Sequence, residues 1–354
     1  MLPTLISFAS PLCKEAIMTL LFRNLALCLM LMIPASVPAL ERPKLTLAVG
    51  GHALLYNLPL AVALQKGYFE EQGLELEVVD FSAGVKALQA MIAGDAEVVS
   101  GAYDHTLRMQ ARGHALRAFV LTAEAPQVVV AVSSRSLPEY CTASDLRGKK
   151  IGISSAGSST QMLANLILAK AGVRADEVTF VEVGASADAA QALHSGKVDV
   201  IAHTEPVISL LEKQHGLHII ADTRHPQGTR ALFGGPMPAG TLYTKVSFIE
   251  ENPRTIQALT NAMVKALHWL RSASAEDVAA LVPTDYLLDD PDLYKQAYRN
   301  IQPALSSNGL FPAQGPALTR QALQAFDPTL REMALSPAGT WTNDFVNAAL
   351  QAMK

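Results

Sequence analysis

Several polar side chains sit in loops where short apolar segments of this sequence end, and they suggest different chemistries. His52, His105 and His203 come from three separate loops. Zinc sites take ligands at short, paired spacings, which these histidines lack, so no metal site is expected. Asp104 and Glu205 occupy related places in two of the loops, where a facing pair of carboxyl groups could do acid–base work. They could equally bind a cationic or amide group or cap helices; capping is favoured for Glu205, and Asp104 stays open.

The segment SSAGSSTQ, residues 154–161, places small residues and hydroxyls where a helix is expected to begin. Ser158, Ser159 and Thr160 stand at this start. Unpaired backbone N–H groups and the helix dipole there favour an anionic or strongly polar ligand group. Ordinary N-capping without a ligand explains the same residues. The segment lacks a Gly-Lys-Ser/Thr ending, so it is not a phosphate-binding P-loop.

Two tyrosines in similar loops, Tyr56 and Tyr103, could stack on a planar ligand or donate hydrogen bonds. Burial in the core is the alternative for both. The sequence has no Gly-x-Ser-x-Gly motif, and the pair Gly50–Gly51 is not followed by a dinucleotide fingerprint. Because no nucleophile stands beside a positioned base, we expect neither catalytic residues nor a cofactor.

An internal repeat positions these loops. The stretch QAMIAGDAEVVSGAYD, residues 89–104, returns 102 positions later as QALHSGKVDVIAHTEP, residues 191–206. A repeat of this length indicates one structural unit used twice. Each unit alternates helical segments with short apolar strands, which predicts parallel sheets covered on both faces. The expected strands are residues 44–51, 74–81, 96–100, 149–154, 178–183 and 198–203.

The predicted fold class is therefore α/β, with two doubly wound lobes joined by two crossover segments. The extended stretches 116–134 and 234–247 are the candidate crossings. We predict one lobe from residues 40–128 and 238–354 and a second from residues 129–237. Open parallel sheets bind ligands beyond the carboxyl ends of their strands, so two facing lobes form a cleft suited to hinge closure.

The first 39 residues have the layout of a secretory signal peptide. Arg23 precedes an apolar run, residues 25–33, which is shorter than the ~20 residues that span a bilayer. An N-terminal membrane anchor is the alternative. Counted from Met18 the leader has an ordinary length, which predicts a start there and a mature chain from near Leu40. Cys141 is then the remaining cysteine, expected to be buried and structural. The net charge of −4 gives no indication of a basic surface that would bind nucleic acid.

Four blocks resemble the solute-binding proteins of ABC importers for nitrate, sulfonates, taurine and related small molecules. The blocks are NLPLAVALQKGYFEEQGLELEVVDF, ALQAMIAGDAEVVSG, DLRGKKIGISSAGSSTQMLANLILAKAGV and FIEENPRTIQALTNAMVKALHWL, within residues 44–270. The resemblance implies the two-crossover periplasmic-binding-protein fold (type II), a periplasmic location and a monomer. It also implies delivery of a small ligand to an inner-membrane permease powered by a cytoplasmic ATPase.

Family ligand sites carried onto this chain fall in the same strand-end loops. The predicted ligand-binding residues are His52, Leu54, Tyr56, Ser82, Gly101, Tyr103, Asp104, Ser158, Ser159, Thr160, His203, Thr204 and Glu205. Some family members bind an oxyanion with a basic side chain, and these loops contain no Arg or Lys. This departure argues against nitrate or an alkylsulfonate and favours a planar aromatic or heterocyclic ligand, with a carboxylate or amide.

The same fold also resembles that of pyrimidine-forming thiamin biosynthesis enzymes and a menaquinone-pathway dehydratase. Those enzymes act in the cytoplasm, and the thiamin enzymes carry a Cys-rich motif. This chain has an apparent export signal and one cysteine beyond it. We therefore expect a binding protein rather than an enzyme, with an enzyme acting on a pyrimidine or similar small metabolite as the alternative.

Overall fold

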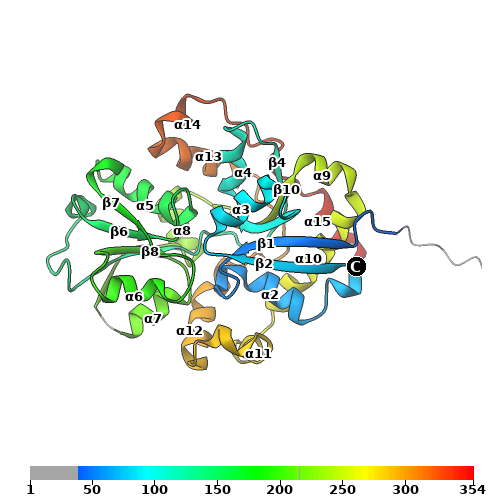
Figure 1. Cartoon of the computed structure of the whole chain (residues 1–354), viewed down its shortest axis with the longest axis horizontal. Helices are drawn as coiled ribbons and strands as arrows, with labels where there is room; N and C mark the ends of the chain where they lie inside the picture. The colour runs from blue at the N-terminus through cyan, green and yellow to red at the C-terminus, as the bar shows by residue number, and fades with distance from the viewer. Residues whose placement is uncertain (1–38, 215) are drawn as a thin grey trace, which may run out of the picture. The chain divides into compact units, whose positions relative to one another are not determined.

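Two five-stranded sheets organise the protein. The computed structural model describes residues 39–214 and 216–354, so residues 1–38 of the predicted signal peptide lie outside it. The strand orders are β2-β1-β3-β10-β4 and β7-β6-β8-β5-β9 (Figure 1). The strands are β1 (Lys44–Gly50), β2 (Glu75–Phe81), β3 (Val98–Ala102), β4 (Leu116–Leu121), β5 (Val129–Ser133), β6 (Lys150–Ile153), β7 (Thr179–Glu182), β8 (Val200–His203), β9 (Leu217–Asp222) and β10 (Gly240–Lys245).

Each sheet is mixed, which corrects the prediction of wholly parallel sheets. In the first sheet β1 pairs in parallel with β2 and β3, whereas β10 runs antiparallel to β3 and β4. In the second, β6 pairs in parallel with β7 and β8, whereas β5 runs antiparallel to β8 and β9. Each antiparallel strand is the one that arrives from the other sheet, so the reversal is a direct consequence of the two crossings.

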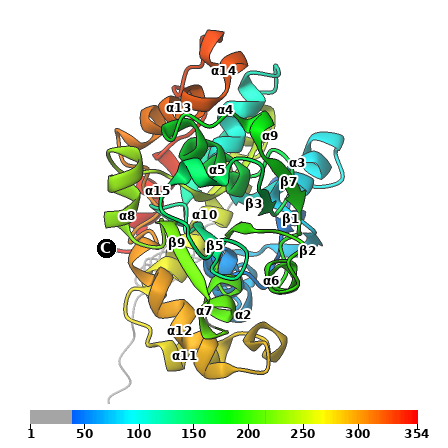
Figure 2. The same ribbon diagram turned by 90° about the vertical axis from the view of Figure 1, so that its left-hand side faces the viewer.

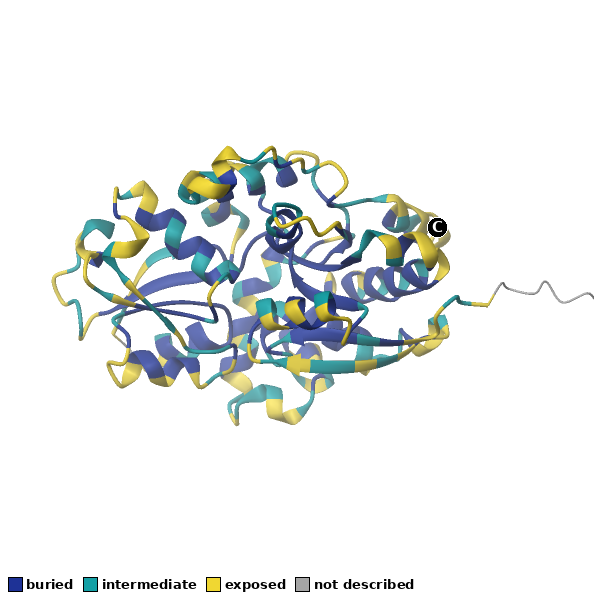
Figure 3. Ribbon diagram, turned by 45° about the horizontal axis from the view of Figure 1, so that its top comes forward, coloured by how far each residue is buried: buried dark blue, intermediate teal, exposed yellow. Residues whose placement is uncertain are grey.

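Helices cover both faces of each sheet. The first sheet shares one core with α2 and α10 and another with α3 and α4, while α6 and α7 lie opposite α5 on the second. The strands are buried between helices whose outer faces are exposed (Figure 3). The helices are α2 (Leu58–Gln65), α3 (Gly84–Ala93), α4 (Asp104–Gln110), α5 (Ser159–Lys170), α6 (Ala189–His194), α7 (Val207–Lys213), α8 (Pro226–Phe233), α9 (Val246–Glu251), α10 (Pro253–Leu270), α11 (Ala275–Leu281), α12 (Pro291–Ile301), α13 (Gly315–Phe326), α14 (Pro328–Glu332) and α15 (Asp344–Ala352).

We call the first sheet with its helices lobe 1 and the second with its helices lobe 2. The doubly wound arrangement predicted from the sequence is confirmed, while the lobe boundaries at residues 128 and 237 stay a prediction. Among the described residues, no helix is both long and apolar enough to cross a membrane. Cys141 is exposed rather than buried, which corrects its predicted place in the core.

The sequence repeat has the same structural role in both lobes. Glu97 accepts a hydrogen bond from the backbone N–H of Thr46 at 2.8 Å, and Asp199 accepts one from that of Lys150 at 2.9 Å. In each lobe, therefore, an acidic side chain just before the third strand of the repeat holds the start of the first. The repeat marks one α/β unit built twice.

Helix α10 illustrates how the sequence pattern sets the packing. Pro253 stands at its first turn, where the missing N–H costs nothing. Ile256, Leu259, Met263 and Leu267 recur at helical spacing and are fully buried against lobe 1. The later helices reach lobe 2 as well: α12 contacts α7, and α13 contacts both α4 and α5 (Figure 2). The C-terminal segment therefore touches both lobes.

Glu41 ties the start of the described chain to α10. Its carboxylate accepts hydrogen bonds from the backbone N–H groups of Arg254 and Thr255. Burial raises the pKa of Glu41, but these bonds outweigh it and lower the pKa to about 2, from 4.5. The stabilisation is therefore present above the unfolded pKa and lost as the pH falls through the folded one.

We expect Glu41→Gln to lower the urea midpoint of unfolding at pH 6. The difference from the wild type should shrink between pH 5 and pH 3, because the wild-type carboxyl loses its advantage there. Urea unfolding curves at several pH values measure this, and a difference that stays constant down to pH 3 would contradict it.

Candidate functional site

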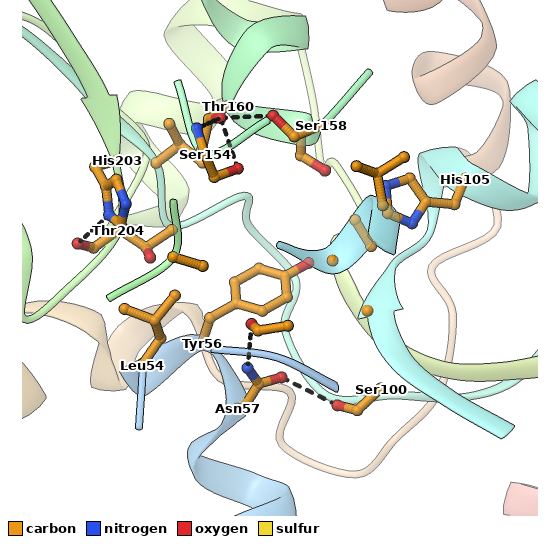
Figure 4. A pocket seen from close by; sticks show the side chains of 18 residues that line it. Leu54, Tyr56, Asn57, Ser100, His105, Ser154, Ser158, Thr160, His203 and Thr204 are labelled. Carbon is orange, nitrogen blue, oxygen red and sulfur yellow. Dashed lines mark hydrogen bonds between the residues drawn. The ribbon is translucent and has the colours of Figure 1, made fainter. Parts of the chain in front are cut away.

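A cavity of about 70 Å³ lies where the loops of the two lobes meet (Figure 4). Most of its walls follow the carboxyl ends of strands, where open parallel sheets bind ligands. Lobe 1 and the first crossing contribute Gly50, Leu54, Tyr56, Asn57, Gly84, Val85, Ser100, Gly101, Ala102, His105 and Val128. Lobe 2 contributes Ser154, Ser158, Ser159, Thr160, Ala185, His203 and Thr204.

The lobes touch each other around this cavity. Ser159 Oγ donates a hydrogen bond to Asp104 Oδ1 at 2.8 Å, and the backbone N–H of Leu55 donates one to the carbonyl of Glu205 at 3.1 Å. A methyl group added at Gly51 would lie 2.3 Å from the carbonyl oxygen of Ala185. Contact on several sides indicates a closed cleft, the state that hinge closure produces around a ligand.

The hydroxyl cluster at the start of α5 caps the helix and also faces the cavity. Ser158 Oγ accepts a hydrogen bond from the N–H of Gln161 at 3.3 Å and lies 2.7 Å from Thr160 Oγ1. Thr160 Oγ1 in turn accepts a hydrogen bond from the N–H of Ser154 at 3.0 Å. The capping interpretation is thus confirmed, and the same residues line the cavity.

Three of the lining residues each have a buried polar atom without a partner among the described residues: Tyr56 Oη, His105 Nε2 and Thr204 Oγ1. An unsatisfied buried polar group costs about 1–3 kcal/mol, so a ligand that pairs with these atoms gains that energy. Burial raises the pKa of Tyr56, and the charge of Asp104 raises it further. Burial lowers the pKa of His105, although Asp104 opposes this. Both rings are therefore neutral near pH 7.

The wall of the cavity carries no charged side chain, and most of its surface is apolar. None of the lining residues is Lys or Arg. His203 is buried and directs Nε2 to the carbonyl of Gly184 at 3.1 Å, so this nitrogen already has a partner. Within residues 39–214 and 216–354, no group of three or more His, Cys, Asp or Glu side chains could hold a metal ion.

The structure brings eight of the predicted site residues to the cavity: Leu54, Tyr56, Gly101, Ser158, Ser159, Thr160, His203 and Thr204. Two others lie directly behind its wall. Asp104 joins Ser159 across the lobes and accepts a hydrogen bond from Arg108 at 3.0 Å. Glu205 caps α7 by accepting the N–H of Ser209 at 2.8 Å, as favoured from the sequence.

Three predicted residues do not line this cavity. His52 is partly exposed. Its Nδ1 lies 2.6 Å from Asp80 Oδ2, and its ring packs against that of Tyr286. Ser82 is exposed and does not cap α3, whose N-cap is Ala83. Tyr103 is fully buried in the core of lobe 1.

The contacts of Tyr103 in the core argue against its predicted ligand contact. Its hydroxyl lies 2.6 Å from Thr340 Oγ1, and its ring packs edge-on against Phe311 at 5.3 Å. We expect Tyr103→Phe to destabilise the fold by about 1 kcal/mol through the lost hydrogen bond and to leave ligand affinity unchanged. Thermal unfolding and a binding assay measure the two effects; a clear loss of affinity with intact stability would return Tyr103 to the site.

The sequence prediction missed ten lining residues: Gly50, Asn57, Gly84, Val85, Ser100, Ala102, His105, Val128, Ser154 and Ala185. Ser154 and Ala102 lie at the ends of strands, and strand ends can be recognised from the sequence. Asn57 and Ser100 form a network that was not: Ser100 Oγ donates to Asn57 Oδ1 at 3.1 Å, and Asn57 Nδ2 donates to the carbonyl of Gly51 at 3.0 Å. Asn57 and Ser100 are 43 residues apart, so no local pattern reveals their contact.

Comparison with solved structures supports this architecture. A structure from Bordetella bronchiseptica RB50 is 46% identical, with a TM-score of 0.86 over 89% of this chain and 99% of that one. The alkanesulfonate-binding protein SsuA from Xanthomonas axonopodis pv. citri, solved bound to MOPS, is 20% identical, with a TM-score of 0.66 over 86% of this chain and 100% of that one. At that identity the likeness to SsuA concerns the fold alone.

Comparison of this sequence with known proteins identifies its family and two relatives, one named as a binding protein and one as an enzyme. Residues 55–276 match a family model described as NMT1/THI5 like. YtlA of Bacillus subtilis (strain 168), named as a binding protein, is 26% identical over 71% of this chain and 73% of its own length. The 4-amino-5-hydroxymethyl-2-methylpyrimidine phosphate synthase THI12 of Saccharomyces cerevisiae (strain ATCC 204508 / S288c) is 22% identical over 75% and 73%.

Proposed function

Because this chain belongs to the NMT1/THI5-like family and has the periplasmic-binding-protein fold, we propose that it captures a small polar or planar organic solute and delivers it to an ABC importer. The observation that carries the proposal is the cavity between the two lobes, three of whose lining residues have an unpartnered buried polar atom. A largely apolar wall with a few neutral hydrogen-bonding groups binds and orients a ligand, while hinge closure excludes water around it.

The proposed ligand carries hydrogen-bond acceptors. Tyr56 offers a hydroxyl that retains its proton, and the lining residues supply no cationic side chain to neutralise an oxyanion. A carboxylate or amide group would fit best at the start of α5, where N–H groups and the helix dipole favour it. The cavity has about half the ~150 Å³ that holds benzene in an engineered cavity, so a ring requires the lobes to separate slightly.

The proposed partners are a permease in the inner membrane and its cytoplasmic ATPase. Solute-binding proteins of this fold work outside the cytoplasm, which agrees with the signal peptide predicted at residues 1–39 and with a periplasmic location. The proposed protein acts as a monomer, because one chain supplies both walls of the cavity.

A second candidate function is enzymatic, since the yeast relative is named as a synthase. His105 would then be the natural acid–base group, because its Nε2 is unpartnered at the cavity. Turnover separates the two functions. An enzyme releases a chemically altered molecule, whereas a binding protein returns its ligand unchanged.

Native mass spectrometry of the protein purified from the periplasm tests the proposal. We expect a small molecule to copurify, to be released unchanged on denaturation, and to raise the melting temperature when added back. Conversion of that molecule during incubation would favour the enzyme. Absence of any bound molecule, together with no thermal shift from a panel of small heterocycles and carboxylates, would overturn both.

Tyr56→Phe and Tyr103→Phe form a matched pair for placing the ligand. Each removes one tyrosine hydroxyl, but only that of Tyr56 lies unpartnered at the cavity. We expect Tyr56→Phe to weaken binding of the copurified molecule about 3- to 10-fold, the value of one hydrogen bond, and Tyr103→Phe to leave it unchanged. Titration calorimetry measures both, and equal affinities would remove the Tyr56 hydroxyl from the site.

A further inference from the structure

His105 stands in the cavity wall with one ring nitrogen bonded and the other free. Its Nδ1 lies 3.0 Å from the hydroxyl oxygen of Tyr243, on β10. Its Nε2 has no hydrogen-bond partner among the described residues, and the residue is only 2% exposed, so water does not readily reach it. In Figure 4 the Tyr56 hydroxyl points toward the side of the cavity where His105 lies. His105 and the Tyr56 hydroxyl therefore lie on the same side of the cavity.

The Tyr243 hydroxyl decides which nitrogen carries the proton. Tyr243 is fully buried, and burial raises the pKa of its hydroxyl, so the oxygen keeps its proton. If His105 Nδ1 were protonated, it would donate to Tyr243 and leave the Tyr243 O–H group without an acceptor, a costly arrangement in a buried site. The favourable arrangement has Tyr243 donating to Nδ1, which places the His105 proton on Nε2.

Neighbouring charged groups do not supply the missing partner. Asp104 precedes His105 on α4, but its Oδ1 accepts from Ser159 and its Oδ2 from Arg108. Arg108 offers only donors, and Tyr56 holds its own proton. Burial also lowers the pKa of His105, which keeps the ring neutral. An acceptor for Nε2–H must therefore come from outside the described residues.

We propose that Tyr243 is a positioning residue that fixes His105 as the tautomer with Nε2–H facing the cavity, so that the ligand must place a hydrogen-bond acceptor there. A carbonyl or carboxylate oxygen or an unprotonated ring nitrogen satisfies this requirement, and an N–H or ammonium group does not. This requirement for an acceptor rests on the proposed binding function and narrows the class of ligand proposed there.

Long-range ¹H–¹⁵N spectra of ¹⁵N-histidine-labelled protein test the tautomer directly, because protonated and bare ring nitrogens have distinct shifts. The His105 signals are those lost in His105→Gln. We expect the wild type at pH 7 to show a protonated Nε2 and a bare Nδ1. Tyr243→Phe should give a mixture of tautomers, whereas Tyr103→Phe should leave the His105 signals in place.

A protonated Nδ1 in the wild type, or an unchanged tautomer in folded Tyr243→Phe, would overturn the role of Tyr243. A circular dichroism spectrum confirms folding of that variant. If Tyr243→Phe does not fold, the wild-type spectrum still decides, because the proposal requires the Nε2–H form.

Pyridine and benzene test the acceptor rule, since the two rings have similar size and pyridine adds one acceptor nitrogen. We expect pyridine to shift the His105 Nε2 signal and to bind about 10-fold more tightly than benzene, a preference that His105→Phe abolishes. Equal binding of the two rings, or binding of neither, would overturn the acceptor rule. The tautomer spectrum needs no ligand, so its outcome is independent of whether the protein serves an importer.

Discussion

Replacing Arg224 with methionine is expected to destabilise the protein by about 3–5 kcal/mol, the cost of removing one partner from a buried ion cluster. The guanidinium is 6% exposed and contacts three carboxylates. It donates to Glu205 at 2.6 Å, to Asp222 at 2.7 Å and to Glu212 at 3.0 Å. Glu205 is fully buried, so without Arg224 its charge would have only neutral donors beside it.

The loss should fall mainly on lobe 2, which contains Arg224 and all three carboxylates. Urea unfolding of the wild type and Arg224→Met, followed by tyrosine fluorescence and circular dichroism, measures the difference. Arg174→Met is the matched control, because the pair of Arg174 with Asp176 is exposed on the same lobe and solvent screens its attraction. Similar losses in the two variants would contradict the role given to burial.

Acid should reduce the effect of Arg224→Met. Burial raises the pKa of Asp222, but hydrogen bonds and charge from Arg224 outweigh it, and the pKa is lowered overall. A carboxyl with a lowered folded pKa contributes stability above its unfolded pKa and loses it as the pH falls. The wild type therefore loses this advantage below about pH 4, and the gap to the variant should narrow there.

Local patterns were enough to predict the α/β units and their duplication. Apolar alternation gave the strands, and the 102-residue offset paired Glu97 with Asp199, which have equivalent roles in the structure. The direction of β5 and β10 was not predictable in this way. Strand direction depends on which neighbour a strand meets after a crossing, and this is decided by packing between distant segments.

In the candidate site, too, local signals were predictable and long-range contacts were not. Ser158 and Thr160 were found because helix capping is a local signal that survives in the sequence. Tyr103 was misplaced because its partners, Thr340 and Phe311, lie more than 200 residues away along the chain. His105 lies in a strand-end loop but was left out of the predicted ligand site, because its link to Tyr243 spans 138 residues. Long-range partners decide whether a polar side chain faces the core or the cavity.

Gly51→Ala is expected to keep both lobes folded and to weaken ligand binding about 10- to 100-fold. An added Cβ would lie 2.3 Å from the carbonyl oxygen of Ala185, in the other lobe, and 2.9 Å from the flexible end of Leu54. Backbone cannot yield as a side chain can, so the lobes must separate at this edge. Overpacking costs about 1–3 kcal/mol, and this cost falls on the closed state alone.

Gly172→Ala separates this contact from backbone strain. Gly51 and Gly172 have φ values of +69° and +66°, so an alanine is similarly strained at both positions. A Cβ at Gly172, beyond the end of α5, meets nothing within 4 Å. Both variants should therefore lose similar stability on heating, while only Gly51→Ala loses affinity for the copurified molecule. With that molecule present, small-angle scattering should show the wild type and Gly172→Ala more compact than Gly51→Ala. Equal affinity and equal compaction in the two variants would mean that the approach of Gly51 to Ala185 is not needed to hold the ligand.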